Sequence, residues 1–179
     1  MNLNKNELFI IRIEENYINL LQSKKKKIDS AETIKIPEVA FKNNEILDVD
    51  LIADKINEYM KKNGVHSDRV VFIISGSDIL IRNTEVPIME QSKILDAAKW
   101  EMTQYLPEQG ENHYIDYEII GKINNKDKKI YSALVCAAPK QKIDKYKELA
   151  DKINLKLTCI EIAANSLARI ARHFCCWFP

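Results

Sequence analysis

The sequence predicts an α/β protein with mixed sheets, and three observations support this fold class. Between Pro87 and Pro107, apolar residues recur at spacings of three and four, which is typical of a helix that buries one stripe. Residues 70–74 are continuously apolar, as in strands that are covered on both faces. Residues 8–13 and 17–21 are apolar runs separated by a short polar turn, which indicates a hairpin. Strands and helices therefore alternate along the chain.

Length and composition are those of a globular protein. The chain has 179 residues, of which 46% are hydrophobic and 30% charged, so it can bury a core. A net charge of +1 gives no field that would attract nucleic acid or an acidic ligand. The apolar runs are far shorter than the roughly 18 residues that span a bilayer, and no signal peptide opens the sequence. We therefore expect a cytosolic protein.

The N-terminal part is expected to contain three antiparallel strands, a helix and a buried strand. A third strand-like run, residues 28–36, follows the hairpin. Asp48 or Asp50 can cap the next helix, and Gly64 can end it, because a short carboxylate accepts free N–H groups and glycine adopts the left-handed conformation. The polar residues 75–78 follow the buried strand, where α/β proteins often bind ligands. A tight turn is favoured, because no helix follows to hold an anion.

The rest of the chain continues the alternation. Pro87 closes an extended segment and Pro107 ends the central helix, because proline lacks the N–H that either element would use. The remaining pattern predicts a hairpin, a helix, a strand and a last helix, at residues 114–123 with 129–138, 141–153, 155–162 and 165–174.

No cysteine or histidine pattern suggests a metal site or a catalytic triad. The cysteines lack zinc-ligand spacing, and the histidines stand in loops and in the tail without a nucleophile beside them. Cys136 and Cys159 lie in predicted strands and are expected to be small buried apolar groups. The other residues of these two types are Cys175, Cys176, His66, His113 and His173.

Two charged features allow more than one interpretation. Asp116 and Glu118 share a strand face, as a carboxylate pair would, but an exposed face or an ion pair between Asp116 and Arg82 explains them as well. The lysine run 24–27 could contact anionic lipid, but it is more commonly a solvated turn between strands.

The central stretch resembles a known family. The resemblance is carried by Arg82, Pro87, Met89, Trp100-Glu101, Tyr105-Leu106-Pro107 and Asp116-Tyr117. These residues are similar to the pattern of the type IV pilus assembly protein PilM family, which belongs to the actin-like ATPase superfamily and is related to the division protein FtsA. Residues 137–140 and 157–164 are similar to that family too, so the resemblance spans residues 7–172.

The resemblance implies two subdomains. Residues 1–81 together with 158–174 would form an actin-like subdomain 1A, residues 82–157 would form the inserted subdomain 1C of FtsA and PilM, and residues 175–179 would be a tail. The family's second half contains the second phosphate loop and the adenosine pocket, and both would lie beyond Pro179. This chain would then hold half of a nucleotide cleft.

The first phosphate loop of the family is altered in this sequence. In the family, Asp-Ile-Gly and small polar residues let backbone N–H groups approach the phosphates. The matching residues here are Arg12-Ile13-Glu14-Glu15-Asn16. Glu14 in place of glycine adds a side chain and a negative charge where phosphate must come close. We therefore expect no cofactor and no metal in this chain, although full-length relatives carry ATP and magnesium.

The function implied by the resemblance is that of a non-catalytic adaptor. It would bind the N-terminal cytoplasmic peptide of a single-span membrane protein of the PilN type, in an apolar crevice between the subdomains, and would contact other pilus assembly proteins but no nucleic acid. The chain would be cytoplasmic and peripheral to the inner face of the cell membrane. The candidate partner-binding residues are Arg82, Pro87, Trp100, Glu101, Tyr105 and Asp116. Trp100 and Tyr105 point in different directions on a helix, and we expect Tyr105 to face the core and Trp100 the groove.

Two other functions share this fold. An ATP-binding, polymerising protein like other actin relatives would need a working phosphate loop. An FtsA-like cell-division protein would need a C-terminal amphipathic membrane helix.

The C-terminal segment is apolar and does not end in polar residues, which favours a truncated chain. Exposed apolar side chains there would give either a homodimer contact, which is favoured, or a disordered, sticky end. The residues concerned are Leu167, Ile170, Phe174, Trp177 and Phe178.

Overall fold

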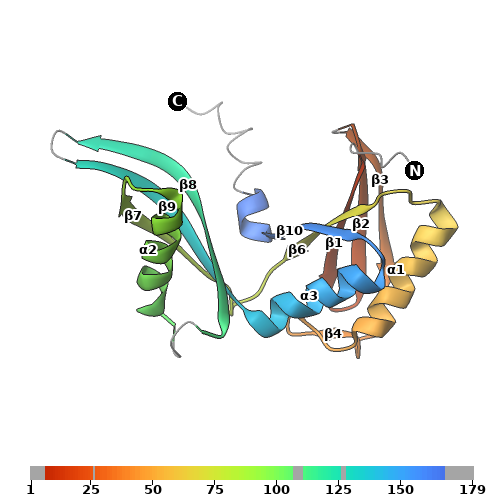
Figure 1. Cartoon of the computed structure of the whole chain (residues 1–179). Helices are drawn as coiled ribbons and strands as arrows, with labels where there is room; N and C mark the ends of the chain where they lie inside the picture. Colours follow the sequence, from red (N-terminus) through yellow and green to blue (C-terminus); the bar gives the residue numbers. More distant parts are fainter. Residues whose placement is uncertain (1–6, 26, 107–110, 126–127, 168–179) are drawn as a thin grey trace, which may run out of the picture. The chain divides into compact units, whose positions relative to one another are not determined.

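The computed structural model describes residues 7–25, 27–106, 111–125 and 128–167. The chain divides into two compact units (Figure 1). Unit 1 comprises Met1–Gly76 and Asp144–Pro179, and unit 2 comprises Ser77–Ile143. Unit 1 contains parallel and antiparallel strand pairs, so the predicted α/β class with mixed sheets is confirmed.

Unit 1 contains a five-stranded sheet in the order β10-β6-β1-β2-β3. Its strands are β1 (Glu7–Glu14), β2 (Tyr17–Lys24), β3 (Lys27–Lys35), β6 (Arg69–Ile74) and β10 (Lys156–Ile162). The first three strands are antiparallel, as predicted, whereas β1, β6 and β10 run parallel to one another. The continuous apolar sequence of β6 agrees with its place inside the sheet.

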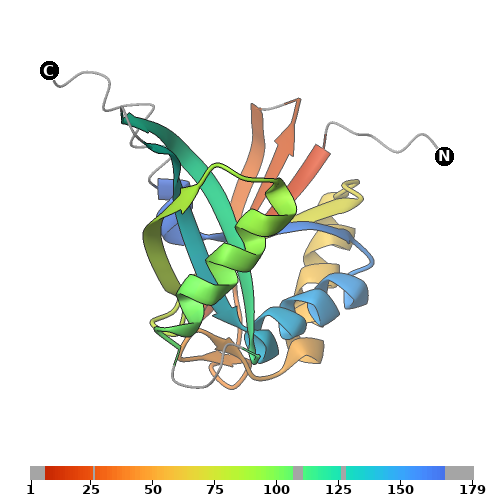
Figure 2. The ribbon, with the colours of Figure 1, turned by 60° about the vertical axis from the view of Figure 1, so that its left-hand side comes forward.

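Helices α1 (Val49–Asn63) and α3 (Lys140–Lys152) cover one face of this sheet (Figures 1 and 2). The ring of Phe9 in β1 stacks on Tyr59 of α1 with the centroids 6.3 Å apart. Phe72 in β6 meets Tyr146 of α3 at 5.2 Å. These aromatic pairs join both helices to the buried face of the strands, where they form the centre of the core.

Both ends of α1 are set by the residues that the sequence indicated. The Asp48 carboxylate accepts a hydrogen bond from the Leu51 N–H at 2.9 Å, so Asp48, and not Asp50, is the N-cap. Gly64 has a φ of +61° and its N–H donates to the carbonyl of Met60. A left-handed residue at this place satisfies a terminal carbonyl and ends the helix.

A short hairpin that the sequence analysis did not predict precedes α1. It consists of β4 (Phe41–Lys42) and β5 (Glu45–Ile46), joined by Asn43 and Asn44. Both asparagines have positive φ, 53° and 60°, as the two-residue turns that match strand twist require. The Asn-Asn pair was the available signal.

Unit 2 is a three-stranded antiparallel sheet in the order β7-β9-β8, with helix α2 on one face. Its elements are β7 (Leu80–Pro87), α2 (Gln91–Thr103), β8 (His113–Asn125) and β9 (Lys128–Pro139). Ile94, Ala98 and Met102 of α2 pack on Ala133 and Val135 of β9 in a core of their own. The predicted strand, helix and hairpin of the central stretch are thus confirmed.

The division into units differs from the subdomain ranges expected from the resemblance. Residues 144–157 were expected in the inserted part, but they lie in unit 1. The reason is the stripe of Tyr146, Leu149 and Ala150, all buried, since Tyr146 packs on Phe72 of β6. The assignment of the units to subdomains 1A and 1C stays a prediction.

Two expectations about buried residues are wrong. Tyr105 is 44% exposed instead of part of the core, because α2 ends at Thr103 and the helical spacing no longer applies beyond it. Cys159 is exposed on β10, the edge strand of its sheet, whereas Cys136 is partly buried on β9.

The last predicted helix begins in the described part of the chain, where residues 163–167 are helical. Leu167 is 65% exposed, as expected for an apolar surface residue there. Ile170, Phe174, Trp177 and Phe178 lie outside the described residues, so the homodimer contact stays a prediction.

Candidate functional site

The first group of candidate residues meets at the C-terminal end of α2 in unit 2. The guanidinium carbon of Arg82 lies 3.8 Å from the centroid of the Tyr105 ring, which is a cation–π contact. Arg82 lies in β7 and points to the α2 face of the sheet, since it is paired with the buried Val135. Tyr105 follows the last turn of α2 and is held by an N–H bond to the carbonyl of Met102 at 3.0 Å. The contact therefore joins the start of β7 to the end of the helix.

Trp100 lies on the side of α2 that faces away from the sheet. Ile94, Ala98 and Met102 define the buried stripe, and a residue two positions from Ala98 is turned about 200° from it at 3.6 residues per turn. The indole is accordingly 68% exposed. Its neighbour Glu101 is partly buried. A large aromatic ring that the core does not use is available for a partner.

Pro87 and Asp116 lie on the opposite face of the same sheet. Asp116 is paired with Cys136, and Cys136 with Ile81, so these three side chains share the face away from α2. Pro87 follows Ile81 by six residues and, because strand side chains alternate, points the same way. The six predicted partner-binding residues thus occupy two faces of unit 2.

The same register decides between the interpretations of Asp116 and Glu118. Both side chains are exposed and share a face, as predicted. An ion pair between Asp116 and Arg82 is excluded, because Arg82 points to the other side of the sheet. The carboxylate of Asp116 instead accepts a hydrogen bond from the N–H of Tyr117 at 2.8 Å.

The position of the expected phosphate loop lies at the β1–β2 turn of unit 1. Arg12 and Glu14 form an ion pair of 2.8 Å on one face of β1. Glu14 is paired across the turn with Tyr17. The pKa of Tyr17 is raised above 10.0, chiefly because its hydroxyl hydrogen-bonds the Glu14 carboxylate, whose charge also opposes the phenolate. Tyr17 was missed in the sequence, although a two-residue turn places its flanking residues opposite each other.

This cluster borders an open hollow of about 440 Å³. The lining residues are Arg12, Glu14, Glu15, Asn16, Tyr17, Asn44 and Ser75. The Ser75 hydroxyl lies 3.4 Å from the side-chain oxygen of Asn44, which connects the end of β6 to the β4–β5 turn. The guanidinium of Arg12 is neutralised by Glu14, and Glu15 adds a second carboxylate, so the hollow disfavours a phosphate electrostatically.

Two further properties of the described residues concern metal binding and membrane insertion. Among the residues described, no group of three His, Cys, Asp or Glu side chains is placed to hold a metal ion. In the same part of the chain, none of the helices has the length and apolar character needed to cross a bilayer.

Comparison with protein-family models identifies one family. A model of the family described as type IV pilus assembly protein PilM matches residues 12–179. A comparison with curated protein sequences gives no match.

Solved structures show the same fold. One structure, described as the PilM–PilN type IV pilus biogenesis complex, has a TM-score of 0.73 at 16% identity. The match covers 90% of this chain and 50% of the chain in that structure. A second similar structure is the cytoplasmic domain of EpsL, an inner membrane component of the type II secretion system of Vibrio cholerae. Its TM-score is 0.57 at 10% identity, and the match covers 87% of this chain and 57% of the EpsL chain. The chain thus spans about half the length of these two structures. Because the family model covers nearly the whole sequence, this chain belongs to the type IV pilus assembly protein PilM family.

Proposed function

We propose that this chain is a non-catalytic adaptor of a type IV pilus assembly machine. It binds the N-terminal cytoplasmic peptide of a single-span membrane protein of the PilN type, and it lies in the cytoplasm at the inner face of the cell membrane through that partner. The observation that carries this proposal is the 68% exposed indole of Trp100 on the outer side of α2.

The chemistry of this part of unit 2 suits a peptide partner. Tryptophan, tyrosine and arginine are the residues that most often contribute large binding energies at protein interfaces. Trp100 provides apolar area, and the Arg82–Tyr105 pair provides a preformed cation and ring at the end of α2. The partner class comes from the family, since one member with this fold was solved as a PilM–PilN complex.

The proposal uses the face of α2 and makes the other face of the sheet the alternative. Pro87 and Asp116, the remaining candidates, lie there. A peptide on that face would depend on Asp116 and not on Trp100, so substitutions of these two residues distinguish the two surfaces.

Calorimetric titration with the synthetic N-terminal peptide of the PilN protein from the same organism tests this proposal. Trp100→Ala should weaken binding by about 2 kcal/mol, roughly thirtyfold, as expected for a central aromatic anchor. Arg82→Ala should weaken it as well. Asp116→Ala and the control Lys61→Ala, an exposed residue of unit 1, should leave the affinity unchanged. Equal affinity for wild type and Trp100→Ala would reject the α2 surface.

The non-catalytic part of the proposal is supported by the β1–β2 turn. Arg12, Glu14 and Tyr17 are paired with one another where the resemblance would place the phosphates. Titration of the chain with ATP and magnesium should give no measurable heat of binding. A submicromolar dissociation constant would favour the actin-like nucleotide-binding alternative.

A further inference from the structure

One end of unit 1 carries a concentration of lysines that the partner-binding proposal does not use. The chain has a net charge of only +1, so a local excess is a matter of placement and not of composition. We call this region the basic end and define it by Lys24, Lys25, Lys27, Lys61 and Lys62. Strands β1, β6 and β10 begin at this end because they are parallel, and α1 ends here because it leads directly into β6.

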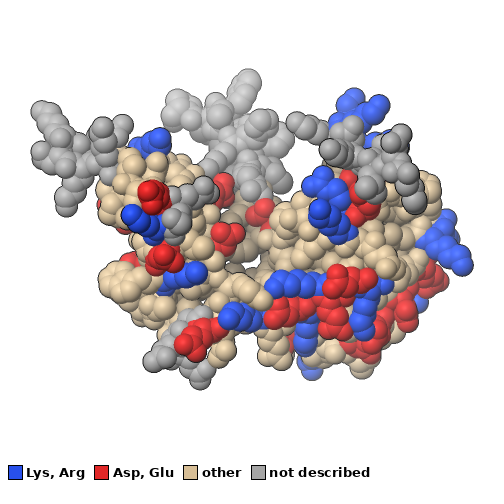
Figure 3. Space-filling model, viewed as in Figure 1, with Lys and Arg blue, Asp and Glu red and all other residues tan. Residues whose placement is uncertain are grey.

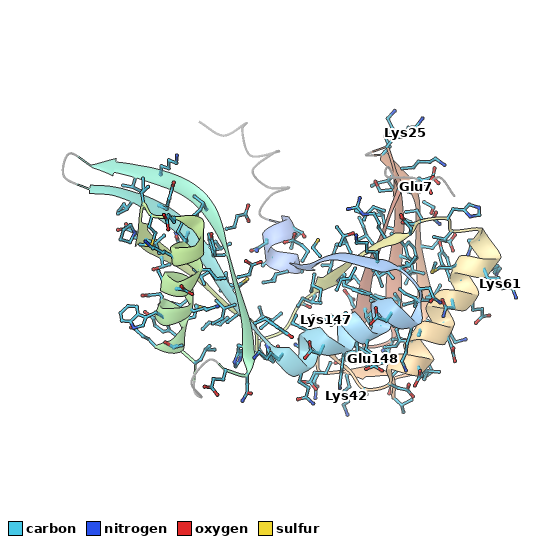
Figure 4. The ribbon with its side chains drawn as sticks, in the orientation of Figure 1. Glu7, Lys25, Lys42, Lys61, Lys147 and Glu148 are labelled. Carbon is cyan, nitrogen blue, oxygen red and sulfur yellow. The ribbon has the colours of Figure 1, made fainter. Side chains whose placement is uncertain are left out.

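The lysines come from two elements that border one hollow. Lys24, Lys25 and Lys27 lie at the tip of the β2–β3 hairpin, and Lys61 and Lys62 in the last turn of α1. A hollow of about 80 Å³ is lined by Lys24 and Glu7 from the strands and by Gly64 and His66 from the segment after α1, so the two elements are neighbours. Figure 4 shows Lys25 projecting from the hairpin tip and Lys61 from the end of α1.

Acidic residues at the basic end are fewer than the lysines. Glu7 forms an ion pair of 2.9 Å with Lys24, and Asp29 lines the same hollow. Glu32 in β3 and Asp68 before β6 add two more carboxylates. The five lysines still exceed these four carboxylates, even without Lys26, which lies outside the described residues. Figure 3 shows blue atoms at the tip of this end, whereas the surface over α1 and α3 mixes red and blue.

An apolar side chain is exposed among these charges. Ile28 is 70% exposed and lies next to Lys27 at the start of β3. β3 is the outermost strand of the sheet, so this tip projects from an edge. Surfaces that bind anionic bilayers typically combine lysines with exposed aliphatic side chains. The lysines contact the anionic headgroups, and the aliphatic side chain inserts into the interface.

We propose that the basic end of unit 1 contacts an anionic phospholipid surface directly. A nucleic acid is the less suitable partner, because binding of single strands relies on aromatic stacking, and the described residues of the tip, 20–25 and 27–32, include no aromatic ring. The contact is independent of the peptide proposed above, since the lysines lie in unit 1 and Trp100 in unit 2.

Sedimentation of the full chain with phosphatidylcholine vesicles, with and without phosphatidylglycerol, tests the proposal. The chain should partition onto the anionic vesicles alone, and rising salt should release it. Each lysine near an anionic surface changes the partition about fivefold, so Lys24→Gln, Lys25→Gln and Lys27→Gln together should lower it by about a hundredfold. Ile28→Ser should also lower it. Glu7→Gln should raise it, because the Glu7 carboxylate no longer neutralises Lys24.

A matched control separates a local surface from net charge. The triple variant with Lys42→Gln, Lys55→Gln and Lys147→Gln removes the same number of positive charges, but from other parts of unit 1. It should leave the partition unchanged. Both triple variants should keep the peptide affinity of the wild type, so failure here is distinct from failure of the adaptor proposal. Equal loss in the control, binding to neutral vesicles, no binding at all, or preference for a nucleic acid duplex over the vesicles would each overturn the proposal.

Discussion

At the residue scale, the β1–β2 turn shows how a few side chains change what a fold can bind. Alternation along β1 places Arg12 and Glu14 on one face, and the two-residue turn brings Tyr17 opposite Glu14. The sequence revealed the charges at residues 12 and 14, but not their pairing, because pairing depends on rotamers and on the partner strand. As a result, the Arg12 guanidinium and the Tyr17 hydroxyl both already interact with the Glu14 carboxylate.

The titration of Tyr17 provides a test of this cluster. Its phenol should titrate above 10.0, because the Glu14 carboxylate accepts its hydrogen bond and opposes the phenolate. A raised pKa means that the bond stabilises the fold fully below pH 10.0 and that this contribution is lost as the pH rises through the higher folded value.

Glu14→Gln removes the opposing charge and should lower the pKa of Tyr17 towards its ordinary value. Ultraviolet titration of phenolate absorbance, taken as the difference from Tyr17→Phe, measures it. An unchanged Tyr17 pKa in the Glu14→Gln variant would show that the two side chains do not interact.

At the element scale, prediction succeeded where caps and periodicity coincide. The helix α1 was placed from Asp48, an apolar stripe and Gly64, and each has the expected role. The end of α2 was misplaced because the apolar spacing continues through Tyr105 towards Pro107, whereas the helix itself ends at Thr103. The β4–β5 hairpin was missed because two-residue strands have no periodicity, and its only signal was Asn43-Asn44.

The site was predicted less completely than the fold, and for a physical reason. The resemblance to the family indicated candidate residues such as Trp100, Arg82 and Asp116. The face of the sheet on which each strand residue lies depends on strand register, because a shift of one residue moves every side chain to the opposite face. The register placed Asp116 away from Arg82, which no local pattern could have shown.

The caps of α1 give the second prediction. Asp48→Ala should lower the free energy of unfolding by about 1 kcal/mol, since the Leu51 N–H loses its acceptor. Gly64→Ala should cost about 1 kcal/mol, because alanine is strained at a φ of +61°, while its Cβ would make only an ordinary contact with His66 Nε2 at 3.9 Å. Urea unfolding followed by circular dichroism measures both, with Asp54→Ala, on an exposed part of α1, as the control. A Gly64→Ala variant as stable as the wild type would contradict the left-handed cap.

At the scale of the whole molecule, the chain passes between its two units at two places, after Gly76 and after Ile143. Inside unit 2, the segments next to both crossings are joined by one ion pair. The ammonium of Lys142 lies 2.6 Å from the Asp78 carboxylate, and its side chain is 3% exposed. Loss of the counter-charge destabilises a protein far more when the remaining ammonium is buried than when it is on the surface.

This pair should respond unequally to removal of its two members. Asp78→Asn leaves the buried cation without a counter-charge and should destabilise the protein by about 3 kcal/mol, the low end for buried pairs because Asp78 is partly exposed. Lys142→Met keeps the apolar stem and leaves only a solvated carboxylate, so it should cost less. Thermal and urea unfolding of both variants measures this order. Equal costs, or a larger cost for Lys142→Met, would contradict the buried-cation description.

The adaptor proposal is tested most directly by the fluorescence of Trp100 itself. The chain has two tryptophans, so Trp177→Phe leaves Trp100 as the only indole. Because Trp100 is 68% exposed, its emission should be that of an indole in water, and it should shift to shorter wavelength in a saturable way as the PilN-type N-terminal peptide is added. A scrambled peptide should cause no shift. Saturable binding seen by calorimetry with no change in Trp100 emission would place the partner on another surface, and no binding by either method would contradict the adaptor function.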